Sequence, residues 1–329
     1  MNPIADQYRI IREAAGWIDR RGRGLLRVEG RDAIPFLQAL VTNDVGRLAR
    51  GEGIYATHLT AQGRMIADLE IYHRGEALIA AVASGVAAPL AARLDDAIFA
   101  EDVRVSDATA ALADLLIVGG GAAALVSRAL GIDLVALNAL PELAQLDVAD
   151  GFVARSGEAP IDAFRIVAPA EPGHQIARRI EAHGALPMKD EFVEALRVAA
   201  GRPAFGIDMT DQTIPLEAGL LDRGISTTKG CYVGQEIIIR VLHRGAGRMA
   251  KRLVTLAWDP PPAAPRPAAS TPLVHEGRAI GHLTSIAPAL TGEGVIGLGY
   301  VARDMATIGQ QVTIGDRDGL VAEITGFAR

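Results

Sequence analysis

The chain has 329 residues, of which 50% are hydrophobic and 22% are charged, and its formal net charge is −6 at pH 7. This length exceeds the size at which one hydrophobic core usually stops growing, so we expect two or three domains that share a cleft. Because the net charge is negative and only 4% of the residues are aromatic, the composition argues against a nucleic-acid-binding protein, which needs a cationic surface and often aromatic platforms.

Membrane spans, secretion signals and metal clusters are not expected either. No apolar run reaches the ~20 residues that a membrane span requires, and residues 1–12 lack the apolar core and cleavage site of a signal peptide. The single cysteine, Cys231, excludes an internal disulfide and a four-thiolate cluster, and the seven histidines have no metal-ligand spacing. We therefore expect no resident metal and a reducing compartment, which is the cytoplasm or, in a eukaryote, the mitochondrial matrix.

The first hundred residues alternate strand-like and helical segments. Period-two runs predict strands at residues 24–29, 53–59, 64–72, 77–82 and 103–105, and helices are expected at residues 32–40 and 84–98. Asp32 is a candidate N-cap, and Gly63 and Gly75 suit hairpin turns. These segments predict an α+β unit with an antiparallel sheet, which we place at residues 1–110.

A similar order of segments follows. Strands are expected at residues 112–118, 144–148, 151–154 and 164–167, and helices at residues 125–130, 175–183 and 191–200. The run from Gly119 to Ala124 has the loose spacing of a dinucleotide-binding loop, but the apolar run that follows, residues 132–137, ends in Asn138 rather than in the required acidic residue. We interpret the run as a strand-to-helix turn within a second α+β half, at residues 111–250.

After Arg252 the sequence pattern changes to short apolar segments, typical of strands, that are interrupted by glycine and proline. The expected strands are residues 253–258, 279–285, 294–301 and 311–314. Residues 259–270 are rich in proline and cannot join a sheet, so we expect them to form a long loop inside this domain rather than a linker between domains. Residues 251–329 therefore predict a small all-β domain.

The segment from Gly224 to Arg244 carries the densest set of reactive residue types. Gly230 and Gly234 favour a tight, exposed loop around Cys231, and Lys229 beside a helix N-terminus is a setting that lowers a thiol pKa. From Gln235 the chain suits a helix with Glu236, Arg240 and Arg244 at i, i+4 spacing, although residues 237–239 equally suit a strand. From the residues alone, Cys231 is either a reactive thiol or a small buried apolar side chain.

The sequence Lys-Gly-Cys-Tyr-Val-Gly-Gln-Glu at 229–236, followed by Arg240, resembles the signature of the YgfZ family, which is related to the glycine-cleavage T-protein. Further resemblance to these two groups lies in residues 28–44, 62–65, 196–203, 215–217, 277–285 and 297–301, so it covers nearly the whole chain. We refer to residues 229–236 as the signature segment.

This resemblance implies an α+β fold with two ferredoxin-like or Greek-key halves and a C-terminal β-barrel around a central opening that binds tetrahydrofolate or another reduced folate. By the same resemblance, Asp68 and Glu217 would contact the pterin and Arg240 the glutamate tail of the folate. The site residues expected are, for catalysis, Cys231 and Lys229, and, for folate binding, Asp68, Glu217, Tyr232, Gln235, Glu236 and Arg240.

Three functions stay open at this point. The resemblance implies a folate-binding protein that assists the assembly, repair or maintenance of iron-sulfur enzymes, including tRNA-modifying ones, with iron-sulfur proteins or their assembly factors as partners. The alternatives are a folate-dependent aminomethyl or one-carbon transferase of the T-protein type and a noncatalytic scaffold. T-proteins carry a pterin-binding glutamate where this chain has Ala199, and a paired Asp-Asp where it has Ala67-Asp68, which leaves the T-protein binding mode open.

Overall fold

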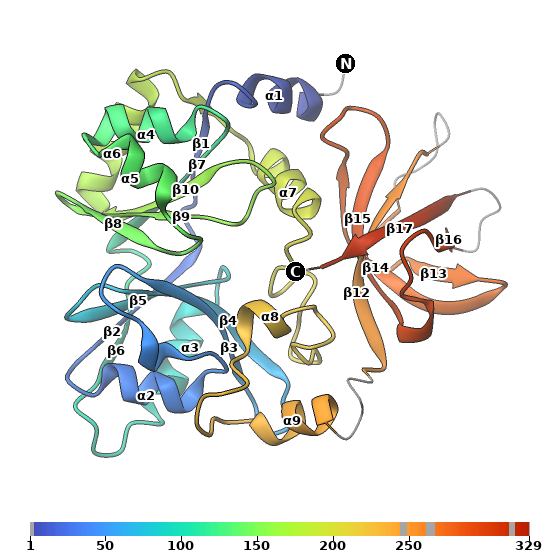
Figure 1. Ribbon diagram of the computed structural model, residues 1–329, viewed down its shortest axis with the longest axis horizontal. Coiled ribbons are helices and arrows are strands. Elements are labelled where there is room, and N and C mark those ends of the chain that lie inside the picture. The colour runs from blue at the N-terminus through green and yellow to red at the C-terminus, as the bar shows by residue number, and fades with distance from the viewer. Residues whose placement is uncertain (1–2, 244–248, 261–266, 316–319, 329) are drawn as a thin grey trace.

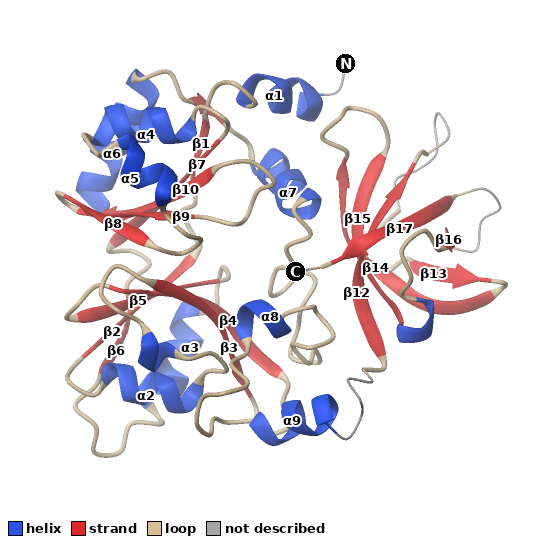
Figure 2. Ribbon diagram, in the orientation of Figure 1, coloured by secondary structure: helices blue, strands red, loops and turns tan. Residues whose placement is uncertain are grey.

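The computed structural model describes residues 3–243, 249–260, 267–315 and 320–328, which form two α+β halves and a β-barrel. Figure 1 shows the two halves one above the other and the barrel beside them. In each half a layer of helices covers the outer side of the sheet, and the two sheets face each other (Figure 2). The α+β fold class and the C-terminal barrel expected from the sequence are confirmed.

The first sheet is antiparallel and has the strand order β3-β4-β5-β2-β6. Its outer face packs against α2 and α3 through buried aliphatic side chains such as Leu37, Ile71 and Leu90. The elements are β2 (Gly24–Glu29), α2 (Ala33–Leu40), η1 (Val45–Arg47), β3 (Gly53–Leu59), β4 (Met65–His73), β5 (Ala77–Val82), α3 (Ala87–Asp95) and β6 (Arg104–Asp107).

The second sheet has the order β11-β1-β7-β10-β9-β8. Its strand β1 comes from residues 16–19 and pairs antiparallel with β7, so the start of the chain lies in the second half. The elements are α1 (Pro3–Ile11), β1 (Gly16–Asp19), β7 (Leu112–Val118), α4 (Ala122–Leu130), α5 (Leu134–Ala139), β8 (Gln145–Val148), β9 (Gly151–Arg155), β10 (Ala163–Pro169), α6 (Ala170–Ala182), β11 (Leu186–Pro187) and α7 (Asp190–Ala199).

The barrel closes in the order β12-β15-β14-β13-β16-β17 around an aliphatic core. The proline-rich segment joins β12 to β13, so it is a loop inside the barrel domain as expected, although residues 261–266 lie outside the described residues. The helices α8 (Leu221–Gly224) and α9 (Gln235–His243) precede the barrel and lie beside β3 and β4 of the first half (Figure 1). The barrel elements are β12 (Lys251–Trp258), β13 (Pro272–His275), β14 (Arg278–Pro288), β15 (Val295–Ala302), η2 (Arg303–Met305), β16 (Gln311–Ile314) and β17 (Val321–Phe327).

Two local expectations have clear outcomes. Asp32 stands before α2 but its side chain makes no capping bond; instead its carboxylate accepts a hydrogen bond from the backbone N–H of Asp102 at 2.9 Å and ties two loops together. The glycine run is a strand-to-helix turn between β7 and α4. A Cβ atom at Gly120 would lie 2.1 Å from the carbonyl oxygen of Arg12. Close backbone packing therefore explains these glycines.

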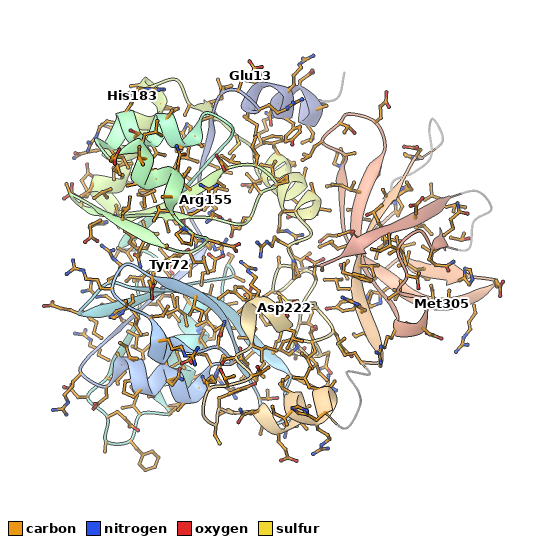
Figure 3. The ribbon with its side chains drawn as sticks, viewed as in Figure 1. Glu13, Tyr72, Arg155, His183, Asp222 and Met305 are labelled. Atoms are coloured by element: carbon orange, nitrogen blue, oxygen red, sulfur yellow. The ribbon has the colours of Figure 1, made fainter. Side chains whose placement is uncertain are left out.

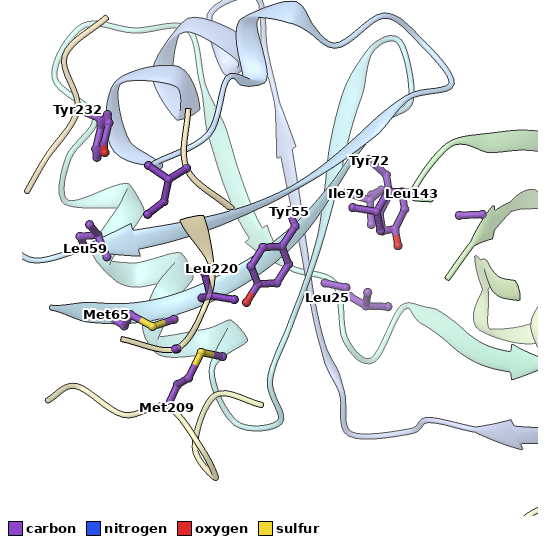
Figure 4. Packing of buried hydrophobic residues seen from close by; sticks show 14 of the residues in the cluster. Leu25, Tyr55, Leu59, Met65, Tyr72, Ile79, Leu143, Met209, Leu220 and Tyr232 are labelled. Atoms are coloured by element: carbon purple, nitrogen blue, oxygen red, sulfur yellow. The ribbon is translucent and has the colours of Figure 1, made fainter. Parts of the chain in front are cut away.

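The two sheets are joined by a hydrophobic cluster and a buried arginine. Tyr72 of β4, Leu143 and Phe152 of β9 belong to this cluster, part of which is drawn in Figure 4. Arg165 of β10 is 1% exposed; it donates to both carboxylate oxygens of Asp114, at 3.0 and 3.1 Å, and to Glu70 of the opposite sheet. Arg165 thus links the two halves.

Candidate functional site

A cavity of about 580 Å³ lies where the two halves meet. The turn after β1, strands β3, β4 and β5, helix α7 and residues 202–207 contribute to its wall. Its charged and aromatic lining residues are Asp19, Arg20, Arg21, Arg23, Tyr55, Asp68, Glu70, Glu158, Asp190, Arg197, Arg202, Phe205 and Arg223. We call it the central cavity.

Asp68 of β4 is half-buried in this cavity and is held by a neutral donor. The Tyr55 hydroxyl donates to Asp68 Oδ2 at 3.0 Å, and the Arg223 guanidinium lies 4.0 Å from the centre of the Tyr55 ring. Burial raises the pKa of Asp68, and this effect outweighs the opposing influence of Arg23 and of the Tyr55 hydrogen bond. Burial also raises the pKa of Tyr55 well above its usual value, so Tyr55 stays a donor. Such a carboxylate is suited to proton transfer.

Arginines surround the carboxylates on the same wall. Arg20 and Arg23 both donate to Glu158, while Arg23 and Arg223 lie 3.4 and 3.5 Å from the carboxylate oxygens of Glu70. Burial disfavours the charged form of Glu158, but Arg20, Arg23 and Arg165 together outweigh it and lower its pKa well below the usual value. Among the ion pairs of the described residues, none involves Asp68, which distinguishes it from Glu70 and Glu158.

A second cavity, of about 620 Å³, adjoins the central cavity because Arg202 and Arg223 line both. Glu142 pairs with both arginines, at 2.9 and 3.4 Å. Burial and, to a smaller extent, the neighbouring Arg223 lower the pKa of Arg202. Figure 3 shows Arg155 and Asp222, which line the second cavity, near the centre of the molecule.

Comparison with known proteins identifies the family. Residues 1–229 match the model of the GCVT N-terminal domain, and residues 251–325 match that of the glycine cleavage T-protein C-terminal barrel domain. The chain belongs to the glycine cleavage T-protein family. An aminomethyltransferase of Synechocystis sp. is 29% identical over 322 residues, covering 94% of this chain and 84% of the relative.

Further relatives of this T-protein-family chain agree with that assignment. The Bacillus subtilis aminomethyltransferase is 26% identical, covering 97% of this chain and 88% of its own. A putative chloroplastic transferase of Arabidopsis thaliana is 29% identical, covering 95% and 71%. The crystal structure of aminomethyltransferase T from Bartonella henselae superposes with a TM-score of 0.86 at 23% identity, covering 98% of this chain and 88% of that one, which shows a shared fold.

Glu217 lies at the junction with the barrel. Its carboxylate is 3.8 Å from Lys251 Nζ, and its backbone oxygen accepts from the N–H of Leu253 at the start of β12. Burial raises the pKa of Glu217. Of the two carboxylates expected at the pterin, only Asp68 is among the described residues that line the central cavity.

The signature segment forms an exposed loop followed by a helix. Cys231 is exposed, as expected for a reactive loop cysteine, and residues 235–243 form α9 rather than a strand. Glu236 and Arg240 form an exposed i, i+4 ion pair at 2.6 Å, whereas Arg244 lies outside the described residues. Gln235 is the first residue of α9. None of these residues is among the described residues that line the central cavity.

Two signature side chains point inward. Tyr232 is buried in the cluster beside Leu59 (Figure 4), and burial raises its pKa to about 12. Lys229 is 9% exposed and donates to backbone oxygens of the first half. The signature motif therefore has buried anchors as well as an exposed thiol.

The arginines and tyrosine of the cavity were not singled out from the sequence. Arg23, Tyr55 and Arg223 are single residues far apart in the chain, and no motif spacing connects them. In the described part of the chain, no group of His, Cys, Asp and Glu is arranged to hold a metal ion, and no helix is long and apolar enough to cross a membrane.

Proposed function

We propose that the protein binds a reduced folate in the central cavity, with Asp68 as the carboxylate that receives the N–H groups of the pterin. The observation that carries this proposal is the position of Asp68, which faces the cavity and has a raised pKa. Within the described residues, the side chain of Asp68 forms no ion pair, and its one side-chain hydrogen bond comes from Tyr55. A carboxylate without an arginine partner retains acceptor capacity for a pair of ligand donors.

The residues present fit a folate. The cavity volume of about 580 Å³ lies in the range of small-molecule sites. Its wall offers a carboxylate for the pterin and guanidinium groups for the glutamate carboxylates. Arg202 and Arg223 line the central cavity, whereas Arg240 lies exposed on α9, so these two arginines are better candidates than Arg240 for the tail.

The first candidate activity is a folate-dependent one-carbon transfer of the aminomethyltransferase type. It is supported by relatives of that name, which match 94% or more of this chain. The folate would supply the nitrogen that accepts the one-carbon unit. The chain would supply Asp68, whose raised pKa lets its carboxyl group accept and return a proton beside the ligand, and Tyr55, which fixes the direction of that carboxyl group.

Titration calorimetry with tetrahydrofolate and formyl-tetrahydrofolate tests this proposal. We expect saturable binding of both compounds, because the cavity offers the carboxylate and cations that they require. Absence of saturable binding at millimolar folate would refute the proposal and leave the noncatalytic scaffold. Incubation with an aminomethyl-lipoyl carrier protein then decides whether the bound folate accepts the one-carbon unit, which is measured as methylene-tetrahydrofolate formed and ammonia released.

A second candidate function is specifically favoured by the signature segment and its exposed thiol. In this function the folate-binding protein acts as a YgfZ-type factor that maintains iron-sulfur enzymes in a reducing compartment, including tRNA-modifying ones. Iron-sulfur proteins or their assembly factors would dock at Cys231. A surface thiol is accessible to a docked protein, whereas a thiol inside the fold is not.

Cys231→Ser distinguishes this function from a structural role of the thiol. Because Cys231 is exposed, we expect the free energy of unfolding to change by less than about 0.5 kcal/mol. The variant should nevertheless fail to restore iron-sulfur enzyme activity in a cell that lacks the protein. Val233→Ser, at another exposed position of the same segment, should restore it. Full restoration of iron-sulfur enzyme activity by Cys231→Ser would show that this function does not require the thiol.

A further inference from the structure

The ammonium group of Lys229 lies against the carboxyl end of α2. Its Nζ donates to the backbone oxygens of Gln38, Val41 and Asn43 at 2.6, 2.6 and 2.9 Å. Burial lowers the pKa of Lys229 to about 8, which still leaves the group charged at neutral pH. Carbonyl groups at the end of a helix have no partner inside the helix and carry partial negative charge, so a cation stabilises them.

An ammonium group has three N–H donors, and here each has a carbonyl acceptor. No N–H of Lys229 is therefore left to hydrogen-bond a thiolate at Cys231. The aromatic ring of Tyr232 lies 5.2 Å from Nζ and adds a cation–π contact on the same buried side. The lysine is directed into the first half, while the cysteine two residues later is exposed.

The residues on both sides of Cys231 are docked on the first half. Before it, the N–H of Ser226 donates to the backbone oxygen of Thr42 at 3.0 Å. After it, Gly234 has a φ of 83°, and a Cβ atom there would lie 2.5 Å from the backbone oxygen of Thr60. Between these points, a Cβ atom at Gly230 would have no neighbour within 4 Å. The exposed turn around Cys231 therefore lies between two segments that are packed against the first half.

We infer that Lys229 is a positioning residue whose ammonium group fastens residues 226–234 to the end of α2 and so presents Cys231 at the surface, rather than an activator of the thiol. Any group that activates Cys231 must then be one other than Lys229. The inference bears on the second candidate function, and neither its argument nor its test depends on folate binding.

Lys229→Met tests the inference through two readouts on the full chain. The first is the pH dependence of iodoacetamide alkylation, which reports Cys231 alone because the chain has one cysteine. The second is amide hydrogen exchange in residues 226–234. We expect an unchanged alkylation midpoint and exchange that is faster by about tenfold or more, because the flank loses its anchor.

Lys189→Met, at an exposed lysine before α7, is the matched control and should change neither readout. If Lys229→Met does not fold, Lys229→Gln replaces it, since the amide keeps two N–H donors without the charge; the same pattern is expected with a smaller rise in exchange. A rise in the alkylation midpoint of about one pH unit, or unchanged exchange in residues 226–234, would overturn the inference in either variant.

Discussion

Replacing Arg165 with leucine is expected to lower the free energy of unfolding by about 3–5 kcal/mol, the usual cost of removing one partner of a buried ion pair. The side chain is 1% exposed and contacts Asp114 in its own sheet and Glu70 in the opposite one. Leucine fills part of the volume of the arginine side chain, but it removes the positive charge that compensates the buried carboxylates of Asp114 and Glu70. Chemical denaturation of the wild type and the variant measures the difference.

Arg178→Leu, at an exposed position of α6, is the control and should change stability by less than about 0.5 kcal/mol. Arg165→Lys should lie between wild type and leucine, because lysine keeps the charge but not the fork that meets both oxygens of Asp114. A loss for Arg165→Leu no larger than that of the control would show that the buried arginine does not hold the two halves together.

The same variant should respond differently to acid. Arginines outweigh burial and lower the pKa values of Asp114 and Glu70 in the folded protein. Groups of this kind stabilise the wild type fully above their unfolded pKa values of about 4, and the stabilisation disappears as the pH falls through the lower folded values. The stability gap between wild type and Arg165→Leu should therefore narrow below about pH 4, since protonated carboxyl groups no longer need the guanidinium.

Local patterns predicted much of the fold because neighbouring residues decide it. The strands of the first sheet alternate in burial or are apolar throughout, and the signature segment has glycines that favour an exposed turn before α9. Strand β1 was not predicted, since four residues carry no clear period and β1 is stabilised by pairing with β7, about a hundred residues later. Long-range pairing of this kind leaves no local signal.

The residues of the candidate site likewise include some that the sequence predicted and others that it did not. Asp68 was expected at the folate through resemblance, and it faces the central cavity. Its partner Tyr55 and the arginines Arg23 and Arg223 come close to Asp68 only in the folded protein. No spacing in the sequence therefore predicts that they belong to one site. Lys229 was expected to act on Cys231, two residues away, yet its three acceptors lie near residue 40. Proximity in sequence did not determine which groups the lysine contacts.

Cys231 and the residues of α9 are not among the described residues that line the central cavity. Folate binding and thiol chemistry are therefore open to independent tests. A variant at Asp68 should affect the first and leave alkylation of Cys231 unchanged, and Cys231→Ser should do the reverse. A one-carbon transferase needs only the cavity, whereas a factor that maintains iron-sulfur enzymes needs both.

Asp68→Asn is expected to weaken tetrahydrofolate binding by about 10- to 150-fold, which corresponds to the ~1.5–3 kcal/mol of a hydrogen bond to a charged group. Asparagine has nearly the same shape and can still accept from the Tyr55 hydroxyl, so the wall of the cavity should persist while the negative charge is lost. Glu217→Gln is the matched control, since Glu217 lies at the barrel junction, and it should bind as the wild type does. Titration calorimetry at neutral pH measures all three proteins.

The pH dependence sharpens this test. Burial raises the pKa of Asp68, so acidification should protonate its carboxyl group, and weaken folate binding by the wild type, at a higher pH than an exposed aspartate would allow. Asp68→Asn has no such carboxyl group, and its weaker affinity should stay flat over that interval. The opposite pattern, in which Glu217→Gln loses affinity and Asp68→Asn keeps it, would assign the pterin to the barrel junction and remove the central cavity from the folate site.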